Sequence, residues 1–384
     1  MLKHLTTLAL VTTCWISTAF ASGGAAASTP RATDTLSITH SRVATSHPRS
    51  THRRTARRAG HASRRNVWDP ASIGDPTAFD DPTGDDPFIR QAAIGAIGNW
   101  KGSVVVVDPS SGRILSMVNQ KLALSSGFTP CSTFKPVVAL AALRDGLITT
   151  STKLSVGGRE RISVNDALAH SNNIFFHRLG EMMGFDRLTK YAQEFGLGEP
   201  AGLDITGESA GHYPSVAPRE GGVGHLAYCG TGIEITALQM AAIISAIANG
   251  GTLYALQYPR TAEDLAAFQP VVRRRVEELA PYIPEIRAGL AGSVLYGTGH
   301  LAFQPELSIY GKTGTCSENG SHLGWFTSYG GDPLRVVVVL LRGGPMMFGS
   351  HAAEIAGRVY RGLAVKDPAL QARQSFPSTL HSTR

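Results

Sequence analysis

The sequence predicts a mixed α/β fold, in which helices flank an antiparallel sheet and a mostly helical subdomain is inserted between strands. The chain has 384 residues, 42% of them hydrophobic, so one large domain or two small ones could bury a core. Strand-like apolar runs lie towards both ends of the patterned region, and apolar residues at helical spacing fill its middle. Strands at both ends of a helical middle imply one sheet whose strands are distant in sequence.

Each element follows from a local pattern. Residues 102–108 contain four consecutive valines, typical of a buried strand, and a turn at 108–112 leads to a second strand at 113–119. Further strands are predicted at 307–315, 322–329 and 334–341. Helical spacing of apolar residues predicts helices at 88–97, 133–143, 164–168, 175–183, 188–195, 236–249, 270–297 and 352–363.

The first residues predict export. Lys3 is followed by an apolar run from Leu5 to Phe20, and Ala19-Phe20-Ala21 is a small-x-small cleavage signal. This layout is typical of a secretory signal peptide, here residues 1–21. The alternative is a retained membrane anchor, but the run is short for a bilayer span and is broken by threonines. We therefore expect an exported protein, periplasmic or extracellular.

The positive charge of the chain is concentrated before the predicted domain. Residues 31–65 hold nine arginines and one acid, although the net charge of the whole chain is only +7. The remainder is close to neutral, which argues against a nucleic-acid-binding domain. Residues 22–87 are predicted to be a disordered basic segment followed by an Asp/Pro-rich linker at 69–87. The basic part is either a solvated spacer or a salt-dependent tether to anionic envelope material.

Three short motifs carry the predicted chemistry. The first is Ser132-Thr-Phe-Lys135 at the start of a predicted helix. Lys135 follows the hydroxyl by one turn, and a lysine desolvated by apolar neighbours can act as the base that a serine nucleophile needs. The alternative is a plain helix-capping serine beside a surface lysine. The second motif is Ser171-Asn-Asn173.

The third motif is Lys312-Thr313-Gly314-Thr315, which follows an apolar strand start. Gly314 leaves room for a ligand along the strand edge. Lys312 and the threonine hydroxyls can hold a substrate carboxylate, and the N–H of Thr315 can contribute to an oxyanion hole. The alternative is an ordinary polar strand end.

Together these motifs and their surroundings resemble penicillin-binding protein transpeptidase domains. The segments that carry the resemblance are Pro130-Cys-Ser-Thr-Phe-Lys-Pro136, His170-Ser-Asn-Asn-Ile-Phe-Phe176 and Gly311-Lys-Thr-Gly-Thr315, supported by Val106–Val118, Phe195–Glu208, Glu234–Gly251 and Tyr296–Gly299. The resemblance predicts a domain over 88–366 with the β-lactamase/transpeptidase-like fold, followed by a flexible tail at 367–384. Two departures are Cys131, where the family usually has Gly, and Tyr228-Cys-Gly-Thr-Gly232, where it usually has Gly-Gln-Gly.

The resemblance also implies a role for each residue. Ser132 would be acylated by D-alanyl-D-alanine peptides of peptidoglycan or by β-lactams, and Lys135 would take its proton. Ser171 would relay a proton to the leaving amine, and Asn173 would bind the ligand amide. The ligand carboxylate would be held by Lys312, Thr313 and Thr315. No metal or organic cofactor is implied, and the sequence gives no oligomeric state.

Two other functions remain open at this point. A serine β-lactamase of class D type uses the same Ser-Thr-Phe-Lys form, although Ser171-Asn-Asn173 has an amide where those enzymes carry an apolar residue. A binding domain that is acylated once and acts as a sensor is the second alternative. The penicillin-binding protein, a transpeptidase or D,D-carboxypeptidase, is favoured over both.

The cysteines raise a further question. Cys131 precedes the expected nucleophile, Cys316 follows Thr315, and Cys229 falls in a segment that by resemblance borders the same cleft. We expect all three near the cleft. Either two of them form a disulfide or all three stay free thiols, because strand alternation can point Cys316 away.

Overall fold

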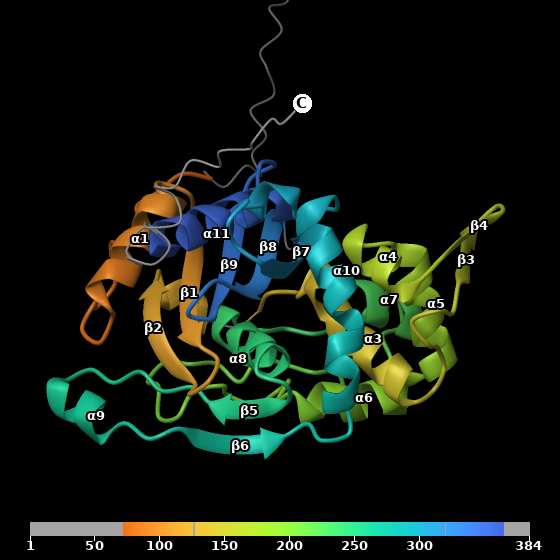
Figure 1. Ribbon diagram of the computed structural model, residues 1–384, viewed down its shortest axis with the longest axis horizontal. Helices are drawn as coiled ribbons and strands as arrows, with labels where there is room; N and C mark the ends of the chain where they lie inside the picture. Colours follow the sequence, from red (N-terminus) through yellow and green to blue (C-terminus); the bar gives the residue numbers. More distant parts are fainter. Residues whose placement is uncertain (1–71, 126, 319, 365–384) are drawn as a thin grey trace, which may run out of the picture. The chain divides into compact units, whose positions relative to one another are not determined.

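The computed structural model describes residues 72–125, 127–318 and 320–364. Its centre is a five-stranded sheet in the order β2–β1–β9–β8–β7, with every neighbouring pair antiparallel (Figure 1). The strands are β1 (Gly102–Asp108), β2 (Arg113–Val118), β7 (Ile309–Glu318), β8 (Ser321–Gly330) and β9 (Arg335–Gly343). Because β1 pairs with β9, strands that precede and follow the helical middle meet in one sheet, which confirms the predicted fold class.

Helices cover both faces of this sheet. One face packs against α1 (Pro87–Ile97) and α11 (Gly349–Ala364), and the other against α8 (Ala237–Ala248). In β1 the four valines divide between the two sides: Val104 and Val106 join the core under α1 and α11, and Val105 and Val107 join the larger core that includes α8. A strand buried on both faces has no polar alternation, which explains the apolar run in the sequence.

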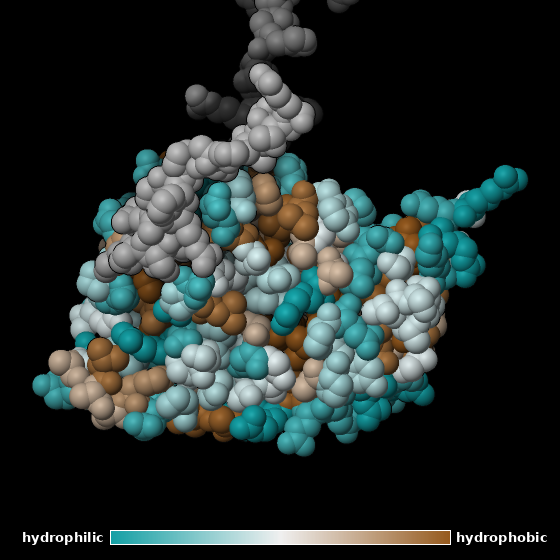
Figure 2. Space-filling model, in the orientation of Figure 1, coloured by the Kyte–Doolittle hydropathy of each residue, from teal (hydrophilic) through white to brown (hydrophobic). Residues whose placement is uncertain are grey.

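The inserted subdomain lies mainly on the side of β7. Its helices are α2 (Gln120–Leu124), η1 (Cys131–Phe134), α3 (Lys135–Arg144), α4 (Val164–Ala169), α5 (Asn173–Met183), α6 (Phe185–Glu194), α7 (Gly222–Cys229), α9 (Ala262–Ala267), η2 (Ala280–Tyr282), α10 (Ile283–Leu295) and η3 (His300–Ala302). Two small two-stranded sheets, the hairpin of β3 (Leu154–Gly157) with β4 (Glu160–Ile162) and the pair of β5 (Thr252–Ala255) with β6 (Val271–Arg275), complete it. The β3–β4 hairpin projects from the molecule, and Figure 2 shows hydrophilic side chains along it.

The single helix predicted over 270–297 is wrong. Residues 271–275 form strand β6, which pairs with β5, and the helix α10 begins only at Ile283. The last three residues of this strand are arginines, and the guanidinium of Arg274 lies 2.6 Å from a carboxylate oxygen of Glu199. The apolar spacing was compatible with a helix, but pairing with a distant strand decided the structure.

The Asp/Pro-rich segment predicted as a linker is packed against the domain where the structure describes it. The guanidinium of Arg90 forms ion pairs with the carboxylates of Asp80 and Asp85, with N–O distances of 3.0 and 2.6 Å. Asp80 also accepts the backbone N–H groups of Asn119 and Gln120, and Asp86 caps α1. The aspartates therefore anchor residues before the predicted boundary at Phe88 to the folded unit.

The predicted signal peptide, the basic segment and the tail at 367–384 lie outside the described residues. Within the described ranges, no helix combines the length and the apolar character needed to span a bilayer.

Candidate active site

Ser132 lies in the 3₁₀ turn η1, which runs directly into α3. The predicted helix started at Thr133, whereas the α-helix begins at Lys135. The N–H and Oγ1 of Thr133 both donate to the carbonyl of Pro130, at 3.2 and 2.5 Å. Ser132 is half-buried, and its Oγ has no hydrogen-bond partner among the described residues. The hydroxyl is therefore free to meet a ligand.

A disulfide joins the residues beside two of the motifs. Cys131 and Cys316 are bonded with their Cα atoms 5.8 Å apart, and Cys229 is free. Cys131 is fully buried and has a φ of 53°, a left-handed conformation that glycine adopts more easily than other residues. This explains why a glycine suits the position. The disulfide resolves the open alternative: strand alternation points Cys316 towards the turn that carries Ser132.

Gly314 lies two residues before Cys316 on β7, so both residues face the turn that carries Ser132. A Cβ on Gly314 would lie 3.0 Å from the carbonyl oxygen of Pro130 and 3.2 Å from the Cβ of Cys131. The sequence suggested that Gly314 makes room for a ligand. The structure shows that its missing side chain lets β7 approach the turn that carries Ser132.

Lys135 is buried with its amino group among polar oxygens. Its Nζ donates to the backbone carbonyl of Ser171 at 2.7 Å, to Ser171 Oγ at 3.1 Å and to Asn173 Oδ1 at 2.7 Å. The rings of Phe176 and Tyr228 lie 5.4 and 6.0 Å from Nζ. Burial lowers the pKa of Lys135 to about 7, against a smaller opposing effect of Cys229. A large share of this lysine is thus neutral near neutral pH.

The second motif is placed by the junction of α4 and α5. Ser171 has a φ of 55° and ends the turn after α4. Asn172 caps α5 by accepting the N–H of Phe175 at 2.9 Å, which makes Asn173 the first residue of the helix. The side chain of Asn173 thereby reaches Lys135, although the residue itself is exposed. The structure brings the first two motifs into direct contact.

The third motif lies on the edge strand β7. Lys312 is fully buried, and its Nζ donates to the carbonyl of Thr313 at 3.0 Å. Burial, reinforced by the charge of Lys135, lowers the pKa of Lys312 well below its usual value. Thr315 is exposed, and its Oγ1 accepts the N–H of Gly349, the first residue of α11, at 2.9 Å. The third motif thus combines a fully buried amino group at Lys312 with an exposed threonine at Thr315.

Sequence reasoning missed several residues that hold this arrangement. The hydroxyls of Thr298 and Thr313 lie 2.6 Å apart, and the N–H of Thr298 donates to Ala169. Glu318 accepts the N–H and the Oγ1 of Thr129, at 3.2 and 2.9 Å, just before the turn. Thr298 could have been found from the family resemblance of the Tyr296–Gly299 segment. Glu318 could not, because no local pattern marks it as a partner of Thr129.

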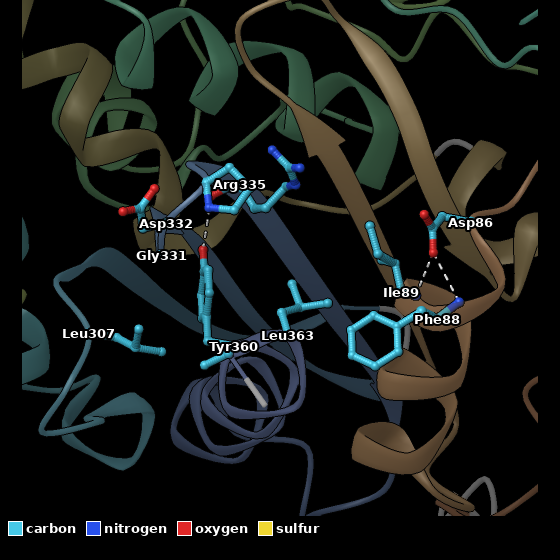
Figure 3. Close-up of a pocket in the computed structure, with 12 residues that line it drawn as sticks. Asp86, Phe88, Ile89, Leu307, Gly331, Asp332, Arg335, Tyr360 and Leu363 are labelled. Carbon is cyan, nitrogen blue, oxygen red and sulfur yellow. Dashed lines mark hydrogen bonds between the residues drawn. The ribbon is translucent and has the colours of Figure 1, made fainter. Parts of the chain in front are cut away.

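A cavity of about 300 Å³ lies elsewhere, between α1, α11 and the turn from β8 to β9 (Figure 3). Tyr360 and Leu363 from α11 and Phe88 and Ile89 from α1 line it, and Tyr360 donates to the carbonyl of Arg335 at its upper edge. None of the three motifs contributes a residue to it.

Several known proteins are similar to this chain in sequence. The chain is 29% identical over 297 residues to the stage V sporulation protein D of Bacillus subtilis, covering 66% of this chain and 44% of that protein. It is 25% identical over 348 residues to the peptidoglycan D,D-transpeptidase MrdA of Haemophilus influenzae, covering 67% and 52%. The chain thus spans about half the length of these relatives.

Solved structures agree on the fold. The transpeptidase domain of penicillin-binding protein 3 from Burkholderia pseudomallei superposes with a TM-score of 0.62 at 22% identity, covering 78% of this chain and 98% of that one. PBP2 of Pseudomonas aeruginosa gives 0.63 at 21% identity, covering 77% and 81%. The family pattern of the penicillin binding protein transpeptidase domain matches residues 102–361, which contain all three motifs. The chain belongs to the penicillin-binding protein transpeptidase domain family.

Proposed function

We propose that this protein is a serine acyl-transferase of the D,D-transpeptidase or D,D-carboxypeptidase type, acting on D-alanyl-D-alanine stem peptides and acylated by β-lactams at Ser132. One observation carries the proposal: a buried lysine with a pKa of about 7 lies one helical turn after an unpaired serine hydroxyl. A neutral amine in that place can take the proton of the hydroxyl.

The contacts of Lys135 with Ser171 support the following reaction. Ser132 Oγ attacks the carbonyl carbon of the scissile bond while its proton passes to Lys135. The carbonyl electrons move to the oxygen, where the N–H groups of Ser132 and Thr315 stabilise the negative charge. When the C–N bond breaks, the proton leaves through Ser171, whose Oγ lies 3.1 Å from Lys135 Nζ, and protonates the departing amine. An acceptor amine or water then releases the acyl group from Ser132.

The second and third motifs orient the ligand in this scheme. Asn173 binds the amide that precedes the scissile bond, and Lys312, Thr313 and Thr315 bind the terminal carboxylate. Because Lys312 is fully buried, a bound carboxylate would supply the negative partner that its ammonium lacks, which favours the protonated form.

The surroundings of Lys135 support a slow release of β-lactams rather than class D hydrolysis. Class D chemistry needs a carbamylated lysine in an apolar pocket. Here the amino group donates to three oxygens of Ser171 and Asn173, and a carbamylated lysine would keep only one N–H to offer them. We therefore expect a β-lactam adduct to persist for minutes, and turnover that added bicarbonate accelerates would argue for the β-lactamase instead.

A peptide assay tests the proposed activity. The protein is incubated with a peptide ending in D-Ala-D-Ala, with and without an amine acceptor, and D-alanine release and the transfer product are measured. Release without acceptor indicates a carboxypeptidase, and a transfer product indicates a transpeptidase. If neither forms and Ser132→Ala behaves like the wild type, the proposal fails.

We also propose that the protein works outside the cytoplasm. The apolar run and the Ala19-Phe20-Ala21 signal support export, and a disulfide such as Cys131–Cys316 is stable in oxidising compartments. N-terminal sequencing of the processed protein should give Ser22. The basic segment at 22–65 is then a spacer or an electrostatic tether, and a tether predicts that envelope association falls as salt rises from tens to hundreds of millimolar.

A further inference from the structure

A groove lined by three cations opens near the active site, outside the three motifs. Its volume is about 370 Å³, and it lies between residues 74–79, α2 and the end of β9. Lys101, Lys121 and Arg342 line it, and all three are exposed. None of them has a carboxylate within 4.0 Å in the described part of the chain.

The acid in the groove does not neutralise these cations. The carboxylate of Asp75 accepts the N–H and the Oγ1 of Thr77, at 2.8 and 2.7 Å, and closes its own turn. These hydrogen bonds lower the pKa of Asp75, so it stays charged. Three positive charges and one negative charge leave the groove with an excess of positive charge.

The groove also offers an apolar floor. Phe79 and Leu122 line it, and the Nζ of Lys121 lies 5.7 Å from the centre of the Phe79 ring. The guanidinium of Arg342 lies 5.5 Å from the centre of the Phe128 ring. The aliphatic stem of Lys101 lies beside Gly74, since a Cβ added to Gly74 would be 3.3 Å from the Cε of Lys101. These contacts hold the cations around a concave surface with apolar and charged parts.

Sheet register places this groove at a defined distance from the catalytic edge. Cys316 on β7 pairs with Leu323 on β8, and Leu323 pairs with Arg342 on β9. Two strand spacings of about 4.8 Å put the backbone of Arg342 roughly 10 Å from that of Cys316. Phe128, which Arg342 contacts, lies four residues before Ser132.

We propose that this groove is a carboxylate-binding subsite for the stem peptide, on the N-terminal side of the scissile bond. The inference rests on the proposed function. An extended peptide advances about 3.3–3.6 Å per residue, so an acid about three or four residues before the scissile bond spans the separation. The cations line a hollow, which an extended peptide can enter and a flat lipid surface cannot.

A pair of substrates tests the subsite in the full-length protein. Two peptides ending in D-Ala-D-Ala are compared, one with a free carboxylate three or four residues before the scissile bond and one with a carboxamide there. The wild type should show the higher kcat/KM for the carboxylate form. Lys121→Ala and Arg342→Gln should each reduce that preference by up to about five-fold, as expected for an exposed ion pair. The preference should weaken with added salt.

Lys153→Ala is the matched control, because Lys153 is an exposed lysine that directly precedes β3. It should leave the preference unchanged. Fluorescent penicillin lacks the peptide acid, so all three variants should label at the wild-type rate, which also shows that they are folded.

Each other outcome is distinguishable. If labelling and peptide turnover are both absent in the wild type, the proposed function fails. If the wild type turns over both peptides equally, or if Lys121→Ala and Arg342→Gln keep the full preference, the subsite is overturned. Co-sedimentation with phosphatidylglycerol vesicles that these variants lose, while the peptide preference persists, would assign the cations to a membrane surface instead.

Discussion

Removing the disulfide should damage both the stability and the catalysis of this domain. The bond between Cys131 and Cys316 closes a sequence separation of 185 residues. The loop-entropy relation gives about 5 kcal/mol for a loop of this size, and typical measured values are about 2–4 kcal/mol. We expect the double change Cys131→Ser with Cys316→Ser to lower the free energy of unfolding by about 2–5 kcal/mol.

The catalytic effect follows from where the bond lies. Cys131 precedes Ser132, and Cys316 follows Thr315, so the bond fixes the distance between the two proposed oxyanion N–H donors. Other contacts hold the turn in parallel, because Glu318 and Trp325 both bind Thr129. The fold should therefore survive, with β-lactam acylation slowed about ten-fold, below the 10²-fold that a displacement of about 1 Å can cost.

Urea unfolding and stopped-flow acylation measure the two effects. Dithiothreitol should bring the wild type to the values of the double variant and leave the variant unchanged. Cys229→Ser is the control, since Cys229 is free, and it should behave like the wild type in both assays. Three free thiols in the denatured, non-reduced protein processed after Ala21, or equal unfolding and acylation in the two proteins, would refute this account.

Three further predictions concern the first and third motifs. Lys135→Ala should slow acylation by about 10²–10⁴-fold, the usual value of a general base, and a smaller loss measured by stopped flow would point to another base. Acylation should rise as the pH passes through about 7 and level off above it, because burial lowers the pKa of Lys135 to about 7 and only the neutral amine accepts a proton. The unfolded lysine retains its proton up to about 10.5, so this group should make the free energy of unfolding increase between those pH values. Gly314→Ala should slow acylation and lower the melting temperature, since its Cβ would lie 3.0 Å from the carbonyl of Pro130; an unchanged acylation rate would show that the turn yields without cost.

The sequence predicted those parts of the fold that depend on local patterns. Buried strands such as β1 and β9 are visible because both faces are covered, so their residues are apolar throughout. Strand β6 and the Asp-rich segment before α1 were misread, because long-range contacts create them. Asp80 binds residues almost forty positions away, and β6 exists only through its pairing with β5.

In the candidate site, too, local features could be predicted from the sequence and long-range contacts could not. The three motifs and the one-turn spacing of Ser132 and Lys135 are readable in the sequence. The contacts of Lys135 with Ser171 and Asn173 require the packing of α3 against α5. The disulfide depends on the left-handed turn at Cys131 and on the face that Cys316 presents, and neither can be read from spacing alone.

The central claim is that Ser132 is the nucleophile. The most direct measurement is to label the protein with fluorescent penicillin, digest it and locate the acylated residue by mass spectrometry. We predict one adduct on Ser132, and none in Ser132→Ala with an unchanged circular dichroism spectrum. An adduct on any other residue, or equal labelling of the Ser132→Ala variant, would contradict the account.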